Sequence, residues 1–126
     1  MDLHEHGGND YWMSARHQRT AEDEEWEIKI STAVAAAVEA TGAVLHNGSE
    51  GYASSAHFES LGPGVFWLNA SVRGEGLNLA DFGAAEYGPA FTVETGMKNS
   101  MSSRVALQKL TVQTAVDVFE QRHSDR

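Results

Sequence analysis

A row of short apolar runs separated by glycine-rich breaks, between residues 51 and 95, constrains the fold of this chain more than any other feature. The runs are Tyr52–Ser60, Val65–Val72, Leu77–Phe82 and Ala90–Thr95. Glycine readily reaches the positive φ angles that tight reversals need, so runs of this length between glycines predict strands joined by turns. We therefore expect a four-stranded, mainly antiparallel sheet in this part of the chain.

A helix is predicted on each side of this sheet. The first follows Thr20, whose hydroxyl can cap it, has an acidic first turn and ends near Gly42. Its apolar stripe, at steps of three and four residues, consists of Trp26, Ile30, Val34, Ala37, Val38 and Thr41. The second helix is capped by Ser102 or Ser103. Its broad apolar face consists of Val105, Leu107, Leu110, Val112, Val116, Val118 and Phe119.

These elements predict a single α+β domain over residues 20–122, with a frayed tail at residues 123–126. A length of 126 residues suits one domain. No apolar run approaches the roughly 20 residues that cross a bilayer, so we expect no membrane contact, and no secretory leader is evident. The chain contains no cysteine, which excludes disulfides and thiolate chemistry.

Residues 1–19 show no apolar period, and we predict that they form a flexible, extended N-terminal arm. Three consecutive large side chains, Tyr11, Trp12 and Met13, stand in its middle. They could pack over the sheet edge of their own subunit, or they could anchor the arm on a neighbouring subunit, because aromatic and Met residues are enriched at interface cores. The candidate interface residues are Tyr11, Trp12, Met13, Trp26, Trp67, Glu86 and Tyr87. Trp67 could instead complete a core layer.

The net charge of −9 argues against a protein that grips nucleic acid. Between residues 31 and 95 one basic side chain, Arg73, stands against seven acidic ones. Proteins gain affinity for DNA and RNA by placing Lys and Arg at phosphates, so we expect no sequence-specific binding through the sheet. A negative surface can still serve where nucleic acid must pass without sticking.

Two histidine-containing patterns could carry chemistry. His4 and His6 lie one residue apart near Asp2 and Asp10, and these are side-chain types that a divalent metal accepts. A closed metal site needs further ligands, and no second cluster lies at a recognisable distance, so we predict a terminal charge cluster without metal.

His57 and Glu59, two residues apart on a predicted strand, could act as an acid–base pair if they lined a pocket. They could equally be a solvent-facing pair on an edge strand. The common catalytic signatures are missing from the sequence. We predict no catalytic residues, no cofactor and no enzymatic activity. The alternative is a small-ligand-binding or metal-binding module, possibly an enzyme, that uses His57 and Glu59 or His4 and His6.

The order of predicted elements resembles the small neck and tail-completion proteins of tailed bacteriophages, which share a fold with tail terminators. In one branch of that group, a Thr-Gly pair follows the first helix, and an aromatic-plus-small pair precedes a Glu and a Gly on a later strand. Thr41-Gly42 and the segment Phe82–Gly88 are the counterparts in this chain. The basic residues that follow Thr-Gly in the family are absent here, since Ala43-Val44-Leu45 take their place.

The resemblance implies a structural virion protein without catalytic activity. It would assemble in the host cytoplasm as a homo-oligomeric, hexameric ring at the head–tail junction or the tail end. There it would join and seal neighbouring neck or tail proteins, and DNA would pass through an acidic lumen.

Overall fold

The computed structural model describes residues 1–16, 20–48, 58–68, 83 and 87–124 of the chain. Within these ranges it shows an α+β fold with two long helices and a five-stranded sheet. The strands are β1 (Asp2–His6), β2 (Tyr11–Ala15), β3 (Phe58–Gly62), β4 (Val65–Leu68) and β5 (Thr92–Gly96), and the helices are α1 (Ala21–Glu39) and α3 (Met101–Ser124). The predicted fold class is therefore confirmed, whereas the predicted sheet is wrong in detail.

The sheet is mixed, with the strand order β1-β5-β2-β4-β3. β1 runs parallel to β5 and β2 runs parallel to β4, while β2–β5 and β3–β4 are antiparallel pairs. Of the predicted meander, the described residues show one hairpin, β3–β4, which turns at Gly62 and Gly64 with positive φ angles. The predicted strand Leu77–Phe82 lies outside the described residues.

The predicted N-terminal arm is wrong for residues 1–16, because this segment supplies two strands of the sheet. β2 lies in the middle of the sheet, between β5 and β4, and all five of its residues are buried. A strand that is covered on both faces has no alternation of polar and apolar residues. The segment Tyr11–Ala15 therefore gave no periodic signal, although it is the central strand.

Helix α1 begins as predicted. The Asp23 amide donates to Thr20 Oγ1 at 3.1 Å, and the Thr20 hydroxyl donates to Asp23 Oδ2 at 2.8 Å. The buried face of α1 is rotated about the helix axis relative to the predicted stripe. Of the predicted residues, Trp26 is only half-buried and Thr41 is exposed. The buried residues are Glu27, Ile30, Ser31, Val34, Ala35 and Val38. Lys29 Nζ lies 4.2 Å from the centre of the Trp26 ring.

Helix α3 begins at Met101, because the hydroxyl of Ser100 accepts the amide of Ser103 at 3.2 Å. The predicted caps, Ser102 and Ser103, lie inside the helix. Its buried residues are Leu107, Thr111 and Ala115, and the apolar face predicted for it is only partly correct, since three of the predicted residues are exposed. These are Val105, Val112 and Val116.

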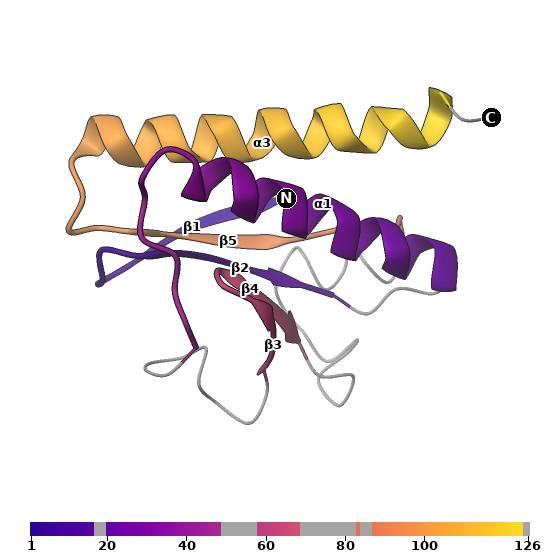
Figure 1. Cartoon of the computed structure of the whole chain (residues 1–126), viewed down its shortest axis with the longest axis horizontal. Coiled ribbons are helices and arrows are strands. Elements are labelled where there is room, and N and C mark those ends of the chain that lie inside the picture. The colour runs from indigo at the N-terminus through magenta and orange to yellow at the C-terminus, as the bar shows by residue number, and fades with distance from the viewer. Residues whose placement is uncertain (17–19, 49–57, 69–82, 84–86, 125–126) are drawn as a thin grey trace.

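Both helices lie side by side on the same face of the sheet and run in opposite directions (Figure 1). The main core fills the space between them and the sheet. Its largest contributions come from Tyr11, Met13, Ile30, Val34, Val38, Val65, Phe91, Val93 and Leu107. A smaller aromatic cluster lies on the second face of the sheet, where Phe58 and Phe66 each stand edge-on to Trp12 with ring centres 5.9 Å apart.

We expect Gly96→Ala to destabilise the protein by about 1–3 kcal/mol. A Cβ atom at Gly96 would lie 2.6 Å from the backbone of Asn9 and 2.7 Å from the carbonyl oxygen of Gly8, so the β1–β2 turn would have to shift. Gly7→Ala is the matched control in the same turn, because its Cβ would meet nothing within 4 Å. Urea denaturation of both variants checks this, and equal midpoints would contradict the close packing of the turn on β5.

Candidate functional site

The second face of the sheet, away from the helices, carries a network of histidines and carboxylates. His4 Nε2 lies 3.1 Å from Asp2 Oδ2, and His4 Nδ1 lies 3.5 Å from Glu94 Oε1. Burial raises the pKa of Glu94 above its usual value, and the nearby His4 and His6 oppose this shift. Both His4 and Glu94 line a cavity of about 290 Å³, with Trp12, Ser14, Arg16, Phe58, Leu68 and Thr92.

His6 takes different partners from His4, although both side chains lie on the same face of β1. His6 Nε2 lies 2.9 Å from the carbonyl oxygen of Asp10, and the Asp10 carboxylate in turn contacts His46 Nδ1 at 2.5 Å. Among the described residues, no group of three or more His, Cys, Asp or Glu side chains is arranged to hold a metal ion. The structure therefore offers no support for the alternative metal site at His4 and His6.

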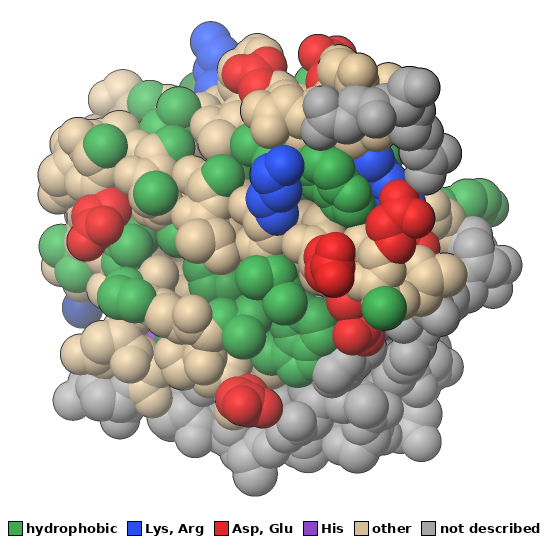
Figure 2. Space-filling model, turned by 45° about the vertical axis from the view of Figure 1, so that its right-hand side comes forward, with side chains coloured by type: hydrophobic (Ala, Val, Ile, Leu, Met, Phe, Trp, Pro, Cys, Tyr) green, Lys and Arg blue, Asp and Glu red, His purple; other side chains and the backbone are tan. Residues whose placement is uncertain are grey.

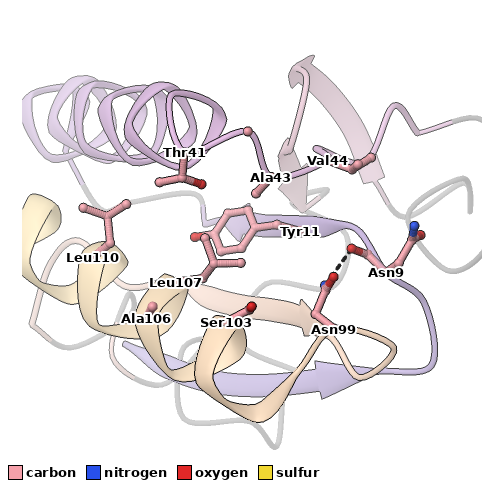
Figure 3. A pocket seen from close by; sticks show the side chains of 11 residues that line it. Asn9, Tyr11, Thr41, Ala43, Val44, Asn99, Ser103, Ala106, Leu107 and Leu110 are labelled. Atoms are coloured by element: carbon pink, nitrogen blue, oxygen red, sulfur yellow. Dashed lines mark hydrogen bonds between the residues drawn. The ribbon is translucent and has the colours of Figure 1, made fainter.

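A second cavity, of about 390 Å³, opens between the end of α1 and the start of α3 (Figure 3). Tyr11 points into the space between the two helices, and its hydroxyl lies 2.9 Å from the Thr111 hydroxyl. The Asn99 side chain closes one end by donating to the carbonyl oxygen of Asn9 at 2.7 Å. Burial raises the pKa of Tyr11. The side chains that line this cavity carry no carboxylate, imidazole or cationic group, so it has no acid–base pair among the described residues.

A line of exposed apolar side chains follows one flank of α3 and continues onto β1. It consists of Leu3, Val105, Val112 and Val116, and we call it the α3–β1 strip. Their exposed fractions are between 40% and 47%, which is high for large aliphatic side chains. The three valines are spaced by seven and four residues, so they share one side of the helix.

Two shallow grooves join the members of the strip. Leu3, Val105 and Val112 line one of them together with Gln108, Lys109 and Gln113. Val112 and Val116 also line the other, whose further lining is Met1, Ile30, Pro89, Phe91, Ala115 and Phe119. The strip is therefore continuous across a helix and a strand. Close by, Arg104 of α3 forms an ion pair with Glu5 of β1.

β1 is an edge strand of the described sheet, with β5 as its neighbour. The Asp2 amide donates to the carbonyl oxygen of Phe91 at 2.8 Å, and the His6 carbonyl oxygen accepts the amide of Met97 at 2.8 Å. Successive residues of a strand direct their backbone groups to opposite edges. The amides and carbonyls of Leu3 and Glu5 therefore face the edge that no described strand covers, where a further strand could bind them.

Four of the predicted interface residues are buried in this chain. Tyr11, Trp12, Met13 and Trp67 are buried inside this chain, so they are not available to a neighbouring subunit. Of the two alternatives for Tyr11, Trp12 and Met13, the structure shows packing within their own subunit. They lie in the central strand, however, and not over a sheet edge. Tyr87 is 81% exposed. Glu86 and His57 lie outside the described residues, and Glu59 is exposed on β3.

On the side of the molecule shown in Figure 2, acidic and basic side chains are interspersed, and the largest apolar area lies in the middle of that face. The described residues on this side form no basic patch of the kind that nucleic-acid-binding proteins present.

Compared with protein-family models, curated proteins and solved structures, the chain matches none of them. Neither of the two described long helices is apolar enough over its length to cross a membrane.

Proposed function

We propose that this chain is a structural subunit that self-associates through the α3–β1 strip. The observation that carries the proposal is the position of four exposed aliphatic side chains beside the open edge of β1. Covering a half-exposed Val or Leu side chain is worth about 1 kcal/mol, and pairing the edge would satisfy backbone groups at the same time. A surface that offers both features favours assembly over catalysis, which needs converging titratable groups in a cleft.

A narrower proposal is that the assembly is a ring in the neck or tail of a tailed phage. It rests on the sequence resemblance alone, which assumed that the first helix precedes all strands; β1 and β2 in fact precede α1. Electron microscopy of the purified protein tests it. Closed six-fold rings would support this assignment, and particles with no closed rotational symmetry above two-fold would contradict it.

We expect wild-type protein to form a dimer or larger oligomer, and Val112→Asp to weaken this association at least tenfold. A carboxylate in the middle of the strip would have to lose water when the strip is covered, which costs several kcal/mol. Light scattering after size exclusion, over a range of concentrations, measures the mass of each protein.

Val44→Asp is the matched control for this substitution. Val44 is 57% exposed and lies in the segment after α1, outside the strip. The same change of side chain there should leave the association unchanged. A wild-type monomer at every concentration, or equal weakening by both variants, would show that the strip is not an assembly surface.

The cavity on the second face of the sheet favours one competing function, the binding of a small polar ligand. It brings His4 and Glu94 within 3.5 Å of each other beside the aromatic ring of Trp12. This pair is an acid–base combination that lines a cavity, whereas His57 of the predicted pair His57 and Glu59 lies outside the described residues. A ligand-dependent rise in melting temperature that His4→Ala and Glu94→Gln both abolish would favour this function.

A further inference from the structure

We infer that a second copy of this chain pairs with β1 in the antiparallel direction, about a two-fold axis at His4. The inference rests on the proposed self-association and names its geometry. The two five-stranded sheets would join into one continuous sheet, with α3 of one copy beside α3 of the other. Two-fold symmetry is the simplest arrangement in which a surface of one copy packs against the same surface of a second copy.

The hydrogen bonds of β1 determine which backbone groups are available for this pairing. Since Asp2 and His6 bond to the β5 side, Leu3 and Glu5 present their amides and carbonyls outward. In an antiparallel ladder, residues that exchange both hydrogen bonds stand directly opposite each other. Leu3 of each copy therefore pairs with Glu5 of the other, which gives four hydrogen bonds between the copies.

The register about His4 is preferred over its neighbours because it uses the whole strand. All five residues of β1, Asp2–His6, then find an opposite residue, and Asp2 faces His6 of the second copy. A carboxylate opposite an imidazole is a favourable cross-strand pair. An axis at Leu3 would leave His6 outside the ladder, and an axis at Glu5 would place two carboxylates opposite each other. In this register, two copies of β1 therefore match in their backbone hydrogen bonds and place a carboxylate opposite an imidazole at both ends.

The α3–β1 strip lies where this symmetry needs an apolar contact. Val105 follows Arg104, which pairs with Glu5, whereas Val112 shares a groove with Met1. Leu3 lines a groove with both valines, so the middle of the helical part of the strip is near the proposed axis. A two-fold axis there turns the second α3 antiparallel to the first. Val105 of one copy would then face Val112 of the other, and the exposed valines of both helices would cover each other.

Cysteine cross-linking tests this register cleanly, because the chain contains no cysteine of its own. His4→Cys places one thiol opposite its own copy in a non-hydrogen-bonded pair, where Cβ atoms are about 4.5–5.5 Å apart and disulfides can form after small adjustments. We expect most of this variant to become a disulfide-linked dimer on mild oxidation.

Asp2→Cys is the matched control on the same face of the same strand. Two copies of Asp2 would be about 13 Å apart, four residues along the strand, so this variant alone should not cross-link. Mixed with His6→Cys, it should form a disulfide between the two different copies. Cross-linking of Asp2→Cys with itself, equal to that of His4→Cys, would overturn the register.

Amide hydrogen exchange provides a second measurement that needs no substitution in β1. In the wild-type oligomer, the Leu3 and Glu5 amides should exchange at least tenfold more slowly than in the monomeric Val112→Asp variant. The His4 amide should be protected in both, because it bonds to β5 in the parallel ladder.

The outcomes separate this inference from the proposed function. An oligomer that neither cross-links at His4→Cys nor protects Leu3 and Glu5 would overturn strand pairing and leave self-association standing. A monomer at all concentrations would overturn both. Cross-linking together with protection of these two amides would support both.

Discussion

Removal of residues 1–16 is expected to abolish folding of this protein. β2 is hydrogen-bonded to β5 on one side and to β4 on the other, so its loss divides the sheet. Its side chains Tyr11, Trp12 and Met13 are almost entirely buried. Each large apolar side chain contributes about 1.5–3 kcal/mol on burial, and a domain has roughly 5–15 kcal/mol of total stability. Circular dichroism and thermal denaturation of the truncated chain measure the effect.

A pair of substitutions controls for effects of the truncation itself. Met13→Ser places a hydroxyl in the core and leaves a cavity, so it should destabilise by about 2–5 kcal/mol. Leu3→Ser, at a side chain that is 41% exposed, should cost less than about 1 kcal/mol. A flexible arm would make both substitutions harmless, and a truncated chain that still unfolds cooperatively would show that β2 is dispensable.

Glu27→Ala is expected to destabilise the protein by about 3–5 kcal/mol, because it leaves two buried backbone donors without their acceptor. Glu27 Oε1 accepts the amide of Arg16 at 2.8 Å, and Oε2 accepts the amide of Ala90 at 2.9 Å. Arg16 directly follows β2 and Ala90 precedes β5, so this carboxylate of α1 holds the adjoining ends of two antiparallel strands. The side chain has no exposed surface.

Glu27→Gln keeps the shape of this side chain but removes its ability to ionise. The amide keeps one acceptor but turns an N–H toward a backbone donor, so we expect a loss of about 1–3 kcal/mol. Glu25→Gln, at an exposed position on the same helix, is the control and should change stability by less than about 0.5 kcal/mol. Equal chemical denaturation curves for the two glutamine variants would contradict the role of Glu27.

The stability of the wild-type protein relative to Glu27→Gln should fall as the pH rises. Burial raises the pKa of Glu27 well above its usual value of 4.5. A carboxyl whose pKa is raised by folding stabilises fully below the usual pKa, and this contribution is lost as the pH rises through the raised value. Denaturation of both proteins between about pH 5 and about pH 8 measures the difference. A difference that grows with pH would contradict the direction of the pKa shift.

Glu27 also shows what sequence reasoning missed in α1. The helix start could be predicted, because Thr20 and Asp23 make a local capping interaction that depends on neighbours three residues apart. The helix dipole accounts for the acids of the first turn, but Glu27 lies beyond that turn and no role is predicted for it from the sequence. Its position three and seven residues before Ile30 and Val34 was the available signal, since it places a carboxylate on the buried face.

The local features of this protein could be predicted from its sequence: the α+β class, the extent of both helices to within a few residues, the Thr20 cap and the glycine turn between β3 and β4. These features depend on periodicity and on backbone preferences over a few neighbouring residues. That Tyr11–Ala15 is the central strand depends on long-range contacts, because its partners β4 and β5 lie about 50 and 80 residues further along the chain.

The candidate site likewise depends on long-range packing and could not be predicted from local sequence patterns. The sequence contained the valines of α3, but periodicity alone placed Val105, Val112 and Val116 in the core. In the structure, Leu107, Thr111 and Ala115 face the interior, and the valines border the open edge of β1. Which side of an apolar helix is covered depends on where the sheet and the second helix lie. The relative position of these elements results from packing between distant segments, so no local sequence pattern predicts it.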